Sequence, residues 1–259
     1  MTESALPHTR VGSGAPLVVF PGLFGRRGVP AGFMRWMQHT EIAELAGDRE
    51  VWSIDRRFGL EPGISFEALA VEHAEAIRQR FDEPVDIVGI STGGSIALQL
   101  AADFPELVRR LVLVSSAYRL SDSGRETQRQ IAALLRQNRS RPAAARFLGN
   151  TGATRTARAL LSLVGRLAPR LVVGHRDPDL LVLLESEDGF DLEARMASIH
   201  VPTLIAGGAR DRFYTTELFE ATHARMPNAS VKIYPRAGHI SIFGNRRLSR
   251  EILGFLSLP

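Results

Sequence analysis

Short apolar runs that alternate with helix-like segments are the feature that most limits how this chain can fold. Each run is four residues long, rich in aliphatic residues and bounded by turn-forming residues. Such runs are typical of strands buried on both faces of a parallel sheet. Strands that alternate with helices indicate βαβ units. The runs are Leu17–Phe20, Val51–Ile54, Val85–Val88, Leu111–Val114, Thr203–Ala206 and Val231–Tyr234.

Segments with a helical repeat of apolar residues lie between these runs or follow the last of them. In Ser65–Phe81, for example, Leu69, Ile77 and Phe81 recur at helical spacing. The other helical segments are Thr92–Phe104, Glu217–Met226 and Leu248–Leu256. The sequence therefore predicts an α/β protein with a mostly parallel sheet flanked by helices.

The alternation is interrupted once, between about Arg119 and His200. This stretch holds no convincing strand apart from the ambiguous run Leu171–Val173. We expect residues 119–201 to form a helical cap or lid, inserted between two strands of a core made by residues 1–118 and 202–259. The predicted helices are Arg125–Arg136, Ala153–Leu167 and Pro178–Glu185, with Pro142, Pro169 and Pro178 as breaks.

Composition excludes several kinds of chemistry. The 259 residues include no cysteine, which rules out disulfides, iron–sulfur clusters, Cys-ligated zinc and a thiol nucleophile. The motifs of zinc proteases, P-loop proteins and dinucleotide-binding proteins are absent, so we expect no metal and no cofactor. Residues 1–16 do not resemble a secretory signal, and no apolar run approaches about 18 residues. We therefore expect no transmembrane segment and a cytoplasmic location.

Basic residues are unevenly distributed along the chain. The formal net charge is +4, and all 32 basic residues except Lys232 are arginines. Codon bias in a GC-rich genome explains the choice of arginine but not its placement. Between Arg119 and Arg176, twelve arginines face only Asp122 and Glu126, a local balance of +10. The rest of the chain therefore sums to about −6.

Three interpretations of the basic segment stay open. It can steer an anionic or carrier-bound substrate, dock on an anionic membrane, or be a solvated face. Nucleic-acid binding is disfavoured because aromatic residues are not interleaved with the arginines, Tyr118 and Phe147 being the exceptions.

Residues 89–93, Gly-Ile-Ser-Thr-Gly, match the G-x-S-x-G pattern. The pattern alone is weak evidence, but its context is informative. Ser91 follows the apolar run Val85–Val88 and opens a helical segment, as the strand–turn–helix of a nucleophile elbow requires. The flanking glycines permit a sharp turn. We therefore predict that Ser91 is a nucleophile.

A serine nucleophile needs a base, and the base needs a carboxylate that orients it. Among the histidines, His239 is best placed, in the loop between the last strand and the last helix. Asp211 lies in the loop after the preceding strand. Loops at the carboxyl ends of strands are where open α/β sheets place their sites. The predicted catalytic residues are therefore Ser91, Asp211 and His239, in an order typical of α/β hydrolases.

With these residues, the chain resembles the α/β-hydrolase fold superfamily, in its cap-bearing esterase or lipase-like branch. The resemblance implies an oxyanion hole formed by the backbone amides of Leu23 and Thr92. Two departures stand out: Pro21 replaces the usual His before Gly22, and the amino-terminal hairpin looks shortened. The matching stretches are residues 17–22, 88–94 and 199–207 with Asp211, together with Gly238-His239.

The implied activity is hydrolysis of a small to medium carboxylic ester or lactone through an acyl-enzyme. A thioesterase, a carbon–carbon bond hydrolase and a tailoring cyclase remain alternatives on the same triad, as does a catalytically silent ligand-binding protein. Serine at the elbow argues against dehalogenases and epoxide hydrolases, which use Asp there. For the substrate pocket we name Phe24, Trp36 and Ile240, although the apolar residues after Leu23 serve equally well for helix packing.

Overall fold

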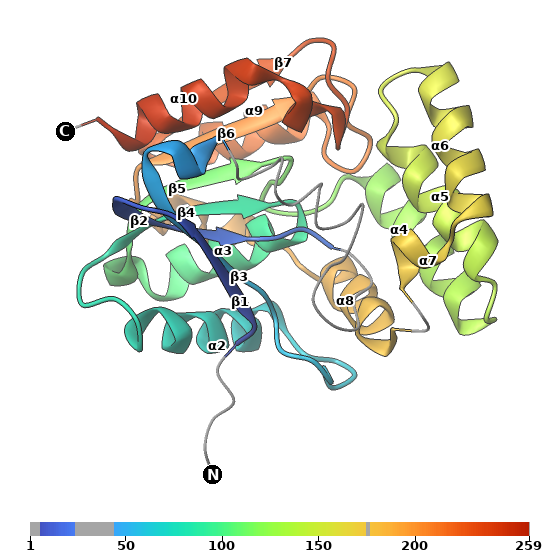
Figure 1. Ribbon diagram of the computed structural model, residues 1–259, viewed down its shortest axis with the longest axis horizontal. Helices are drawn as coiled ribbons and strands as arrows, with labels where there is room; N and C mark the ends of the chain where they lie inside the picture. The colour runs from blue at the N-terminus through green and yellow to red at the C-terminus, as the bar shows by residue number, and fades with distance from the viewer. Residues whose placement is uncertain (1–5, 24–43, 175–176, 259) are drawn as a thin grey trace.

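The predicted apolar runs become neighbouring strands of one sheet (Figure 1). The computed structural model describes residues 6–23, 44–174 and 177–258. Within them the strand order is β1-β3-β2-β4-β5-β6-β7, and every pair is parallel except β1 with β3. The strands are β1 His8–Gly12, β2 Ala15–Phe20, β3 Arg49–Ile54, β4 Val85–Ile90, β5 Val108–Val114, β6 Thr203–Gly208 and β7 Ala229–Tyr234.

Strand β1 is absent from the sequence prediction. Its residues are exposed or half-buried, so it carries no apolar run. It pairs with β3 through backbone hydrogen bonds, with Val11 opposite Val51. The buried strands show the opposite behaviour, because every residue of β4 and β6 is buried. Because both faces of these strands are buried, their residues form continuous apolar runs that can be recognised in the sequence.

Helices cover both faces of the sheet. Side chains of α2, α3 and α9 join one apolar cluster, and those of α10 and the short helix η1 join another. Ser65 caps α2 by accepting a hydrogen bond from the Ala68 amide, which sets the start of that helix. The bounds are η1 Leu45–Gly47, α2 Phe66–Arg78, α3 Thr92–Asp103, η2 Pro105–Leu107, α9 Thr216–Arg225, η4 Ser241–Gly244 and α10 Arg246–Leu256.

The expected helical insertion lies between β5 and β6, and we call it the α4–α8 segment. It stands beside the carboxyl ends of the central strands (Figure 1). The α/β class with a mostly parallel sheet and inserted helices is thus confirmed. The elements are α4 Asp122–Arg136, α5 Ser140–Thr151, α6 Arg155–Leu167, α7 Arg170–Val173 and α8 Pro178–Asp188, followed by η3 Glu193–Ser198.

The insertion contains one helix that the sequence did not predict, and it gives the state of one run that the sequence left ambiguous. Helix α5 was not predicted because Pro142 looked like a break, yet it lies in the first turn of the helix. Proline is tolerated there because the first-turn amides have no intrahelical acceptor. The ambiguous run Leu171–Val173 belongs to the short helix α7 and not to a strand. Tertiary packing decides the state of such a short apolar run.

Strand order determines where a site can form. The chain passes from β2 to β3 on one side and from β4 to β5 on the other, so β2 and β4 flank the point where the order reverses. Open α/β sheets bind ligands outside the carboxyl ends of their strands at such a point. The loops after β2 and β4 begin at Pro21 and Ser91.

No helix within the described parts of the chain is long and apolar enough to cross a membrane.

His73 lies inside the packing between α2 and the sheet. Its Nδ1 is 2.7 Å from the carbonyl oxygen of Leu69, and its ring meets Phe20 edge-on at 4.5 Å. Its Nε2 is buried without a hydrogen-bond partner among the described residues. Burial is the main cause that lowers the pKa of His73 to about 4. The ring is therefore neutral, with Nδ1–H donating to Leu69.

We expect His73 to weaken the fold as the pH falls from 6.5 towards 4. In that window the unfolded chain binds a proton on His73 that the folded protein does not. The free energy of unfolding therefore drops by up to about 3 kcal/mol and is unaffected by His73 above the window. Urea unfolding across a pH series measures this slope. His73→Asn keeps a donor near Nδ1 without titrating, so an unchanged slope in that variant contradicts the assignment.

Candidate active site

Ser91 lies at a sharp turn between β4 and α3. Its φ of 51° falls in the left-handed region that non-glycine residues rarely adopt. The surrounding backbone holds it there: the Ser91 amide donates to the Val114 carbonyl at 2.9 Å, and its own carbonyl accepts from the Gly94 amide at 2.7 Å. Strain at a single residue of this kind is typical of functional turns. The turn leaves the Ser91 side chain half-buried at the carboxyl edge of the sheet.

The two glycines of the pattern are required by close backbone approaches. A Cβ on Gly93 would lie 2.2 Å from the carbonyl oxygen of Phe20, at the end of β2. A Cβ on Gly89 would lie 2.5 Å from the Cα of Gly94. Neither neighbour can move away, because both are backbone atoms of the central strands and of α3. The pattern read from the sequence thus corresponds to a tightly packed strand–turn–helix.

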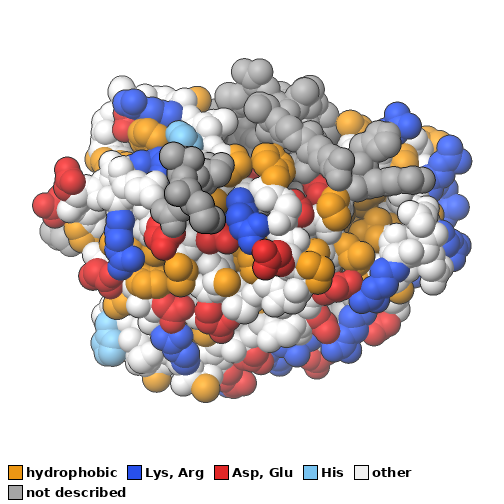
Figure 2. Space-filling view, turned by 90° about the horizontal axis from the view of Figure 1, so that it is seen from below, with side chains coloured by type: hydrophobic (Ala, Val, Ile, Leu, Met, Phe, Trp, Pro, Cys, Tyr) orange, Lys and Arg blue, Asp and Glu red, His pale blue; other side chains and the backbone are white. Residues whose placement is uncertain are grey.

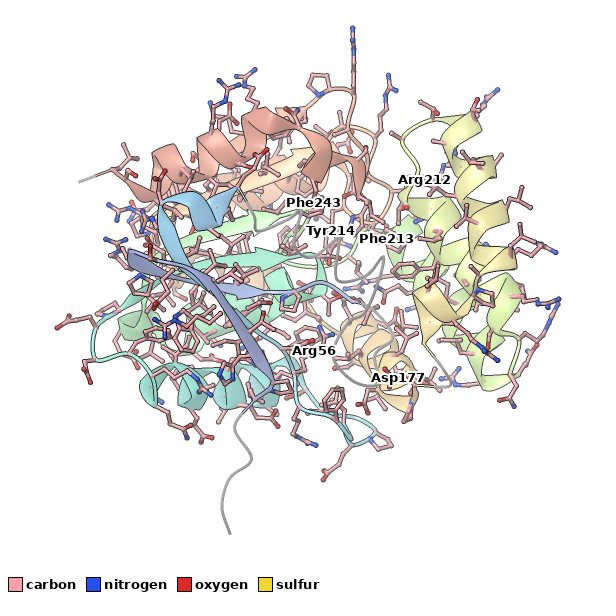
Figure 3. The ribbon with its side chains drawn as sticks, in the orientation of Figure 1. Arg56, Asp177, Arg212, Phe213, Tyr214 and Phe243 are labelled. Atoms are coloured by element: carbon pink, nitrogen blue, oxygen red, sulfur yellow. The ribbon has the colours of Figure 1, made fainter. Side chains whose placement is uncertain are left out.

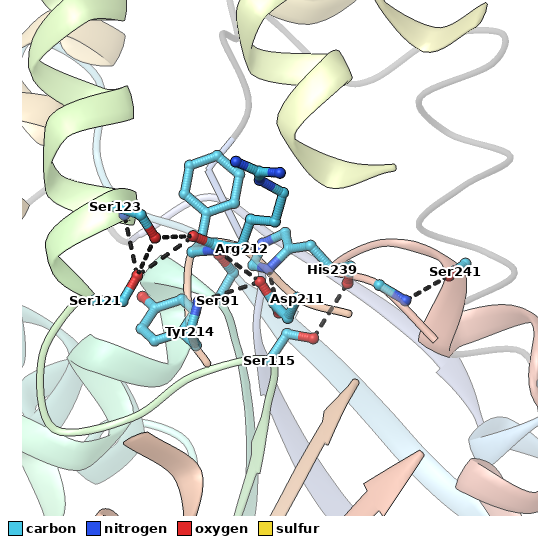
Figure 4. Close-up of polar contacts among 12 residues, drawn as sticks. Ser91, Ser115, Ser121, Ser123, Asp211, Arg212, Tyr214, His239 and Ser241 are labelled. Atoms are coloured by element: carbon cyan, nitrogen blue, oxygen red, sulfur yellow. Dashed lines mark hydrogen bonds and ion pairs between the residues drawn. The ribbon is translucent and has the colours of Figure 1, made fainter. Parts of the chain in front are cut away.

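His239 and Asp211 come from the loops after β7 and β6. Asp211 Oδ2 lies 2.7 Å from His239 Nδ1, and Ser91 Oγ lies 3.0 Å from His239 Nε2 (Figure 4). The structure thus brings the three predicted residues together, although they are far apart in sequence. With Nδ1–H donating to the carboxylate, Nε2 is free to accept the Ser91 hydroxyl proton. This geometry suits proton transfer from serine to histidine.

The carboxylate of Asp211 is fixed by its own loop. Its Oδ1 accepts hydrogen bonds from the amides of Phe213, at 2.8 Å, and Tyr214, at 3.2 Å. The start of α4 secures this loop, because the Ser121 amide donates to the Phe213 carbonyl at 2.9 Å. One oxygen of Asp211 is therefore used for its own positioning, and the other is left to orient His239.

Aromatic rings and a serine hold the His239 loop. The rings of Phe213 and Tyr214 lie 4.9 Å and 6.0 Å from the imidazole, the second nearly parallel to it. Ser115 donates its hydroxyl proton to the His239 carbonyl at 3.1 Å. Figure 3 shows Phe213 and Tyr214 nearer the sheet than Arg212, which lies towards α5 and α6. Sequence reasoning missed these residues, although Ser115 follows β5 directly and so satisfies the strand-end rule used for the others.

The loop after β2 lies against the turn that holds Ser91. A Cβ on Gly22 would lie 3.4 Å from the Cβ of Ser91, so the loop passes close to the serine. Leu23 is buried in this loop, and Thr92 begins α3 directly after Ser91. Both proposed oxyanion donors therefore belong to segments that adjoin Ser91. Arg56, a buried residue, donates to the Pro21 carbonyl at 3.4 Å, a contact by which a side chain other than the usual His holds the loop.

Of the three predicted pocket residues, the structure describes only Ile240. Phe24 and Trp36 lie outside the described residues. Ile240 is half-buried next to His239, where η4 begins. Among the described residues, no cluster of three or more His, Cys, Asp or Glu side chains could hold a metal ion.

A buried carboxylate joins the α4–α8 segment to the first turn of α3, next to Ser91. Glu187, on α8, has no solvent exposure. Thr92 and Ser95, in the first turn of α3, donate hydroxyl protons to it at 3.0 Å and 3.3 Å. The Gln128 amide of α4 donates at 2.8 Å and the Tyr214 hydroxyl at 3.3 Å. Glu187 thus connects helices α4 and α8 with the first turn of α3 and with the Asp211 loop.

Two opposing effects act on Glu187. Burial raises its pKa, whereas the four hydrogen-bond donors favour the charged carboxylate. Burial also raises the pKa of Tyr214 well above its ordinary value, so its hydroxyl stays protonated and can donate. Nothing in the α8 sequence marks Glu187 as special, because its partners come from three other elements.

We expect Glu187→Ala to lower the free energy of unfolding by about 3 kcal/mol or more, because it leaves buried donors without an acceptor. Glu187→Gln keeps the shape and one acceptor oxygen, so it should lose less. Chemical denaturation of both variants beside wild type measures the difference. Equal stability of the alanine variant and wild type would show that the network does not support the fold.

Comparisons with known proteins agree on one family. A model described as the alpha/beta hydrolase family matches residues 17–248. A pimeloyl-(acyl-carrier protein) methyl ester esterase of Neisseria meningitidis is 27% identical over 179 residues, which are 64% of this chain and 54% of that protein. The matched region thus spans about half of that relative. A 2-hydroxymuconate semialdehyde hydrolase of Pseudomonas is 39% identical over 101 residues, 39% of this chain and 30% of that protein.

Solved structures share the fold along almost the whole chain. The α/β hydrolase MGS-M2 from a Medee basin deep-sea metagenome library superposes with a TM-score of 0.84 at 17% identity, covering 98% of this chain and 94% of that one. The enol-lactonase of Burkholderia xenovorans gives a TM-score of 0.80 at 20% identity, with 98% and 96% covered. At such identities these likenesses show the fold alone. The family model covers most of the sequence, and the chain therefore belongs to the alpha/beta hydrolase family.

Proposed function

We propose that the protein is a serine hydrolase that cleaves carboxylic esters, with Ser91 as nucleophile, His239 as general base and Asp211 as the group that orients His239. The observation that carries the proposal is the unbroken chain of hydrogen bonds from Ser91 through His239 to Asp211, at the carboxyl edge of the sheet. The alpha/beta hydrolase family, in which relatives are named as esterases and a lactonase, supports the same assignment.

In this mechanism the Ser91 hydroxyl oxygen attacks the acyl carbonyl carbon while His239 Nε2 takes the hydroxyl proton. Asp211 stabilises the imidazolium that results. The tetrahedral intermediate collapses, His239 gives the proton to the departing alcohol, and an acyl-serine remains. A water molecule then gives a proton to His239 and attacks the acyl-serine, releasing the carboxylic acid and regenerating Ser91.

The backbone amides of Leu23 and Thr92 are our proposed oxyanion donors. The close approach of Gly22 to Ser91 supports this assignment, as does the position of Thr92 at the start of α3. Main-chain donors survive the replacement of the family's usual His by Pro21, because the replaced group is a side chain. Glu187 binds the Thr92 side chain and so steadies the residue that supplies one of the two amides.

We also propose that the α4–α8 segment is the cap over this site and forms part of the substrate pocket. The contacts of Glu187, and those between the start of α4 and the Asp211 loop, support this role. Small esters and carrier-bound esters both fit the proposal, since the Neisseria relative is named for an ester of an acyl-carrier protein. A carbon–carbon bond hydrolase is the second candidate, favoured by the 39% identity to the Pseudomonas hydrolase.

A fluorophosphonate probe should label the wild-type protein at Ser91, because the probe reacts with activated serine hydroxyls. We expect Ser91→Ala to abolish labelling and to lower kcat by about 10⁴-fold or more, with a similar loss in His239→Ala. Mass spectrometry of the labelled peptide identifies the serine, and Ser198→Ala serves as a control on an exposed serine. Absence of labelling in wild type would favour a catalytically silent binding protein.

A panel of substrates should separate the alternatives on this triad. We expect hydrolysis of p-nitrophenyl esters with short to medium acyl chains, in preference to matched acyl-thioesters and to 2-hydroxymuconate semialdehyde. The kcat/KM values of the three classes provide the comparison. A higher value for the thioesters or for the semialdehyde would replace the ester assignment by a thioesterase or a carbon–carbon hydrolase.

A further inference from the structure

The positive charge of the α4–α8 segment is concentrated on α5 to α7. Four arginines of the basic stretch have acidic partners on α8 or just after it. Arg129 pairs with Asp188 at 3.0 Å and Arg136 with Glu185 at 2.8 Å. Arg119 and Arg125 both approach Asp191. The other described arginines of the stretch form no ion pair with described residues: Arg139, Arg141, Arg146, Arg155, Arg158, Arg166 and Arg170.

Six of these arginines and Arg212 line two adjoining hollows. One hollow, of about 1130 Å³, is lined by Arg139, Arg141, Arg166 and Arg170. The other, of about 600 Å³, is lined by Arg139, Arg146, Arg158, Arg166 and Arg212. Because Arg139 and Arg166 line both, the two hollows adjoin, and we call them together the arginine groove. Its described lining includes no Asp or Glu. Blue side chains gather at the corresponding right-hand end of the molecule in Figure 2.

The walls of the arginine groove are held close together. A Cβ on Gly165 of α6 would lie 2.4 Å from the carbonyl oxygen of Ala144 on α5, so the two helices are in direct backbone contact. Arg158, Ser162 and Arg166 recur every four residues and therefore share one face of α6. The positive charges thus stand on a packed frame. Like charges gathered in this way repel one another unless an anion compensates them.

The inner end of the groove adjoins the candidate active site. Arg212 follows Asp211 directly, and its Nε donates to Asn150 Oδ1 at 3.1 Å. Just beyond Asn150, Thr151 and Ala153 lie against Gly238, where an added Cβ would be 3.0 Å from both. Gly238 precedes His239. A ligand in the groove would therefore reach the loops that carry Asp211 and His239.

We propose that the arginine groove binds the phosphate groups of a soluble acyl substrate whose ester bond lies at Ser91. The inference rests on the proposed function for the position of the ester, but not for the phosphate site itself. Arginine suits this ligand because its planar guanidinium donates two parallel hydrogen bonds to phosphate oxygens. Carboxylate alone is a poorer match, because seven uncompensated guanidinium groups favour a ligand with several negative charges.

Three exposed apolar residues of α6 lie outside the lining of this groove, whereas a fourth, Leu167, which is 74% exposed, lines the larger of its two hollows. Leu160, Leu163 and Val164 are 61%, 51% and 42% exposed and project from a different face of the helix than Arg158 and Arg166. An apolar stripe beside arginines also suits the surface of an anionic membrane. The two ligands are distinguishable, because a soluble phosphate needs only the groove, whereas a membrane also needs the stripe.

The first test measures binding without catalysis. Calorimetric titration of Ser91→Ala with tripolyphosphate should give saturable binding of one anion per chain. Arg139→Gln with Arg166→Gln should weaken it about tenfold or more, because both arginines line both hollows. Arg78→Gln with Arg80→Gln removes the same charge near the end of α2, away from α5 and α6, and should leave binding unchanged (Figure 1). Equal weakening in both double variants would overturn the proposal.

The second test uses matched chromogenic esters whose acyl chains end in phosphate or in hydroxyl, each in short, medium and long versions. At one chain length or more, kcat/KM should favour the phosphate ester about tenfold, and the preference should vanish in Arg139→Gln with Arg166→Gln and at high salt. Absence of any preference, or binding only to phosphatidylglycerol vesicles, would overturn the proposal. Tripolyphosphate binding without hydrolysis of any ester would support the phosphate site while refuting the esterase function.

Discussion

The backbone of Ser91 is the constraint on which the rest of the site depends. Its left-handed φ is held by the end of β5 on one side and by the first turn of α3 on the other. The turn needs glycine at positions 89 and 93, because β2 and α3 approach too closely for a side chain. The rest of the fold compensates for the strain at this one residue. As a result, the Ser91 hydroxyl lies at the edge of the sheet where the loops after β6 and β7 begin.

Burial does much of the positioning around that turn. Asp211 divides its two oxygens between its own loop and His239, while Ser115 holds the His239 backbone and two aromatic rings pack near the imidazole. Glu187 extends the arrangement into the inserted helices. A carboxylate without solvent is stable only when it is well hydrogen-bonded, and here four side chains from α3, α4 and the Asp211 loop donate to it. Movement of α8 would therefore disturb the first turn of α3.

The net charge of the basic stretch does not show which of its arginines are paired with acidic residues. Pairing with acidic residues on and after α8 neutralises the arginines of α4, whereas six of the seven described arginines from Arg139 to Arg170 line the arginine groove. An unevenly compensated surface next to an active site acts on charged ligands more than on neutral ones. Under the proposed function, such a surface would raise the hydrolysis of charged esters relative to neutral ones at the same serine.

The sequence by itself determined the alternation of strands and helices and the three strand-end residues Ser91, Asp211 and His239. Strands buried on both faces are apolar throughout, so each strand can be recognised from its own residues. Parallel strands bring their carboxyl ends to one edge, so a residue just after a strand can be placed at that edge without knowledge of its contacts. Strand β1 was not predicted because an exposed edge strand has no apolar run. Helix α5 was not predicted because Pro142 was interpreted as a break, although it lies in the first turn, where proline is tolerated. Only the tertiary structure decided the partners of Glu187 and which arginines stay unpaired. Those contacts join segments far apart in the chain, and no local pattern encodes them.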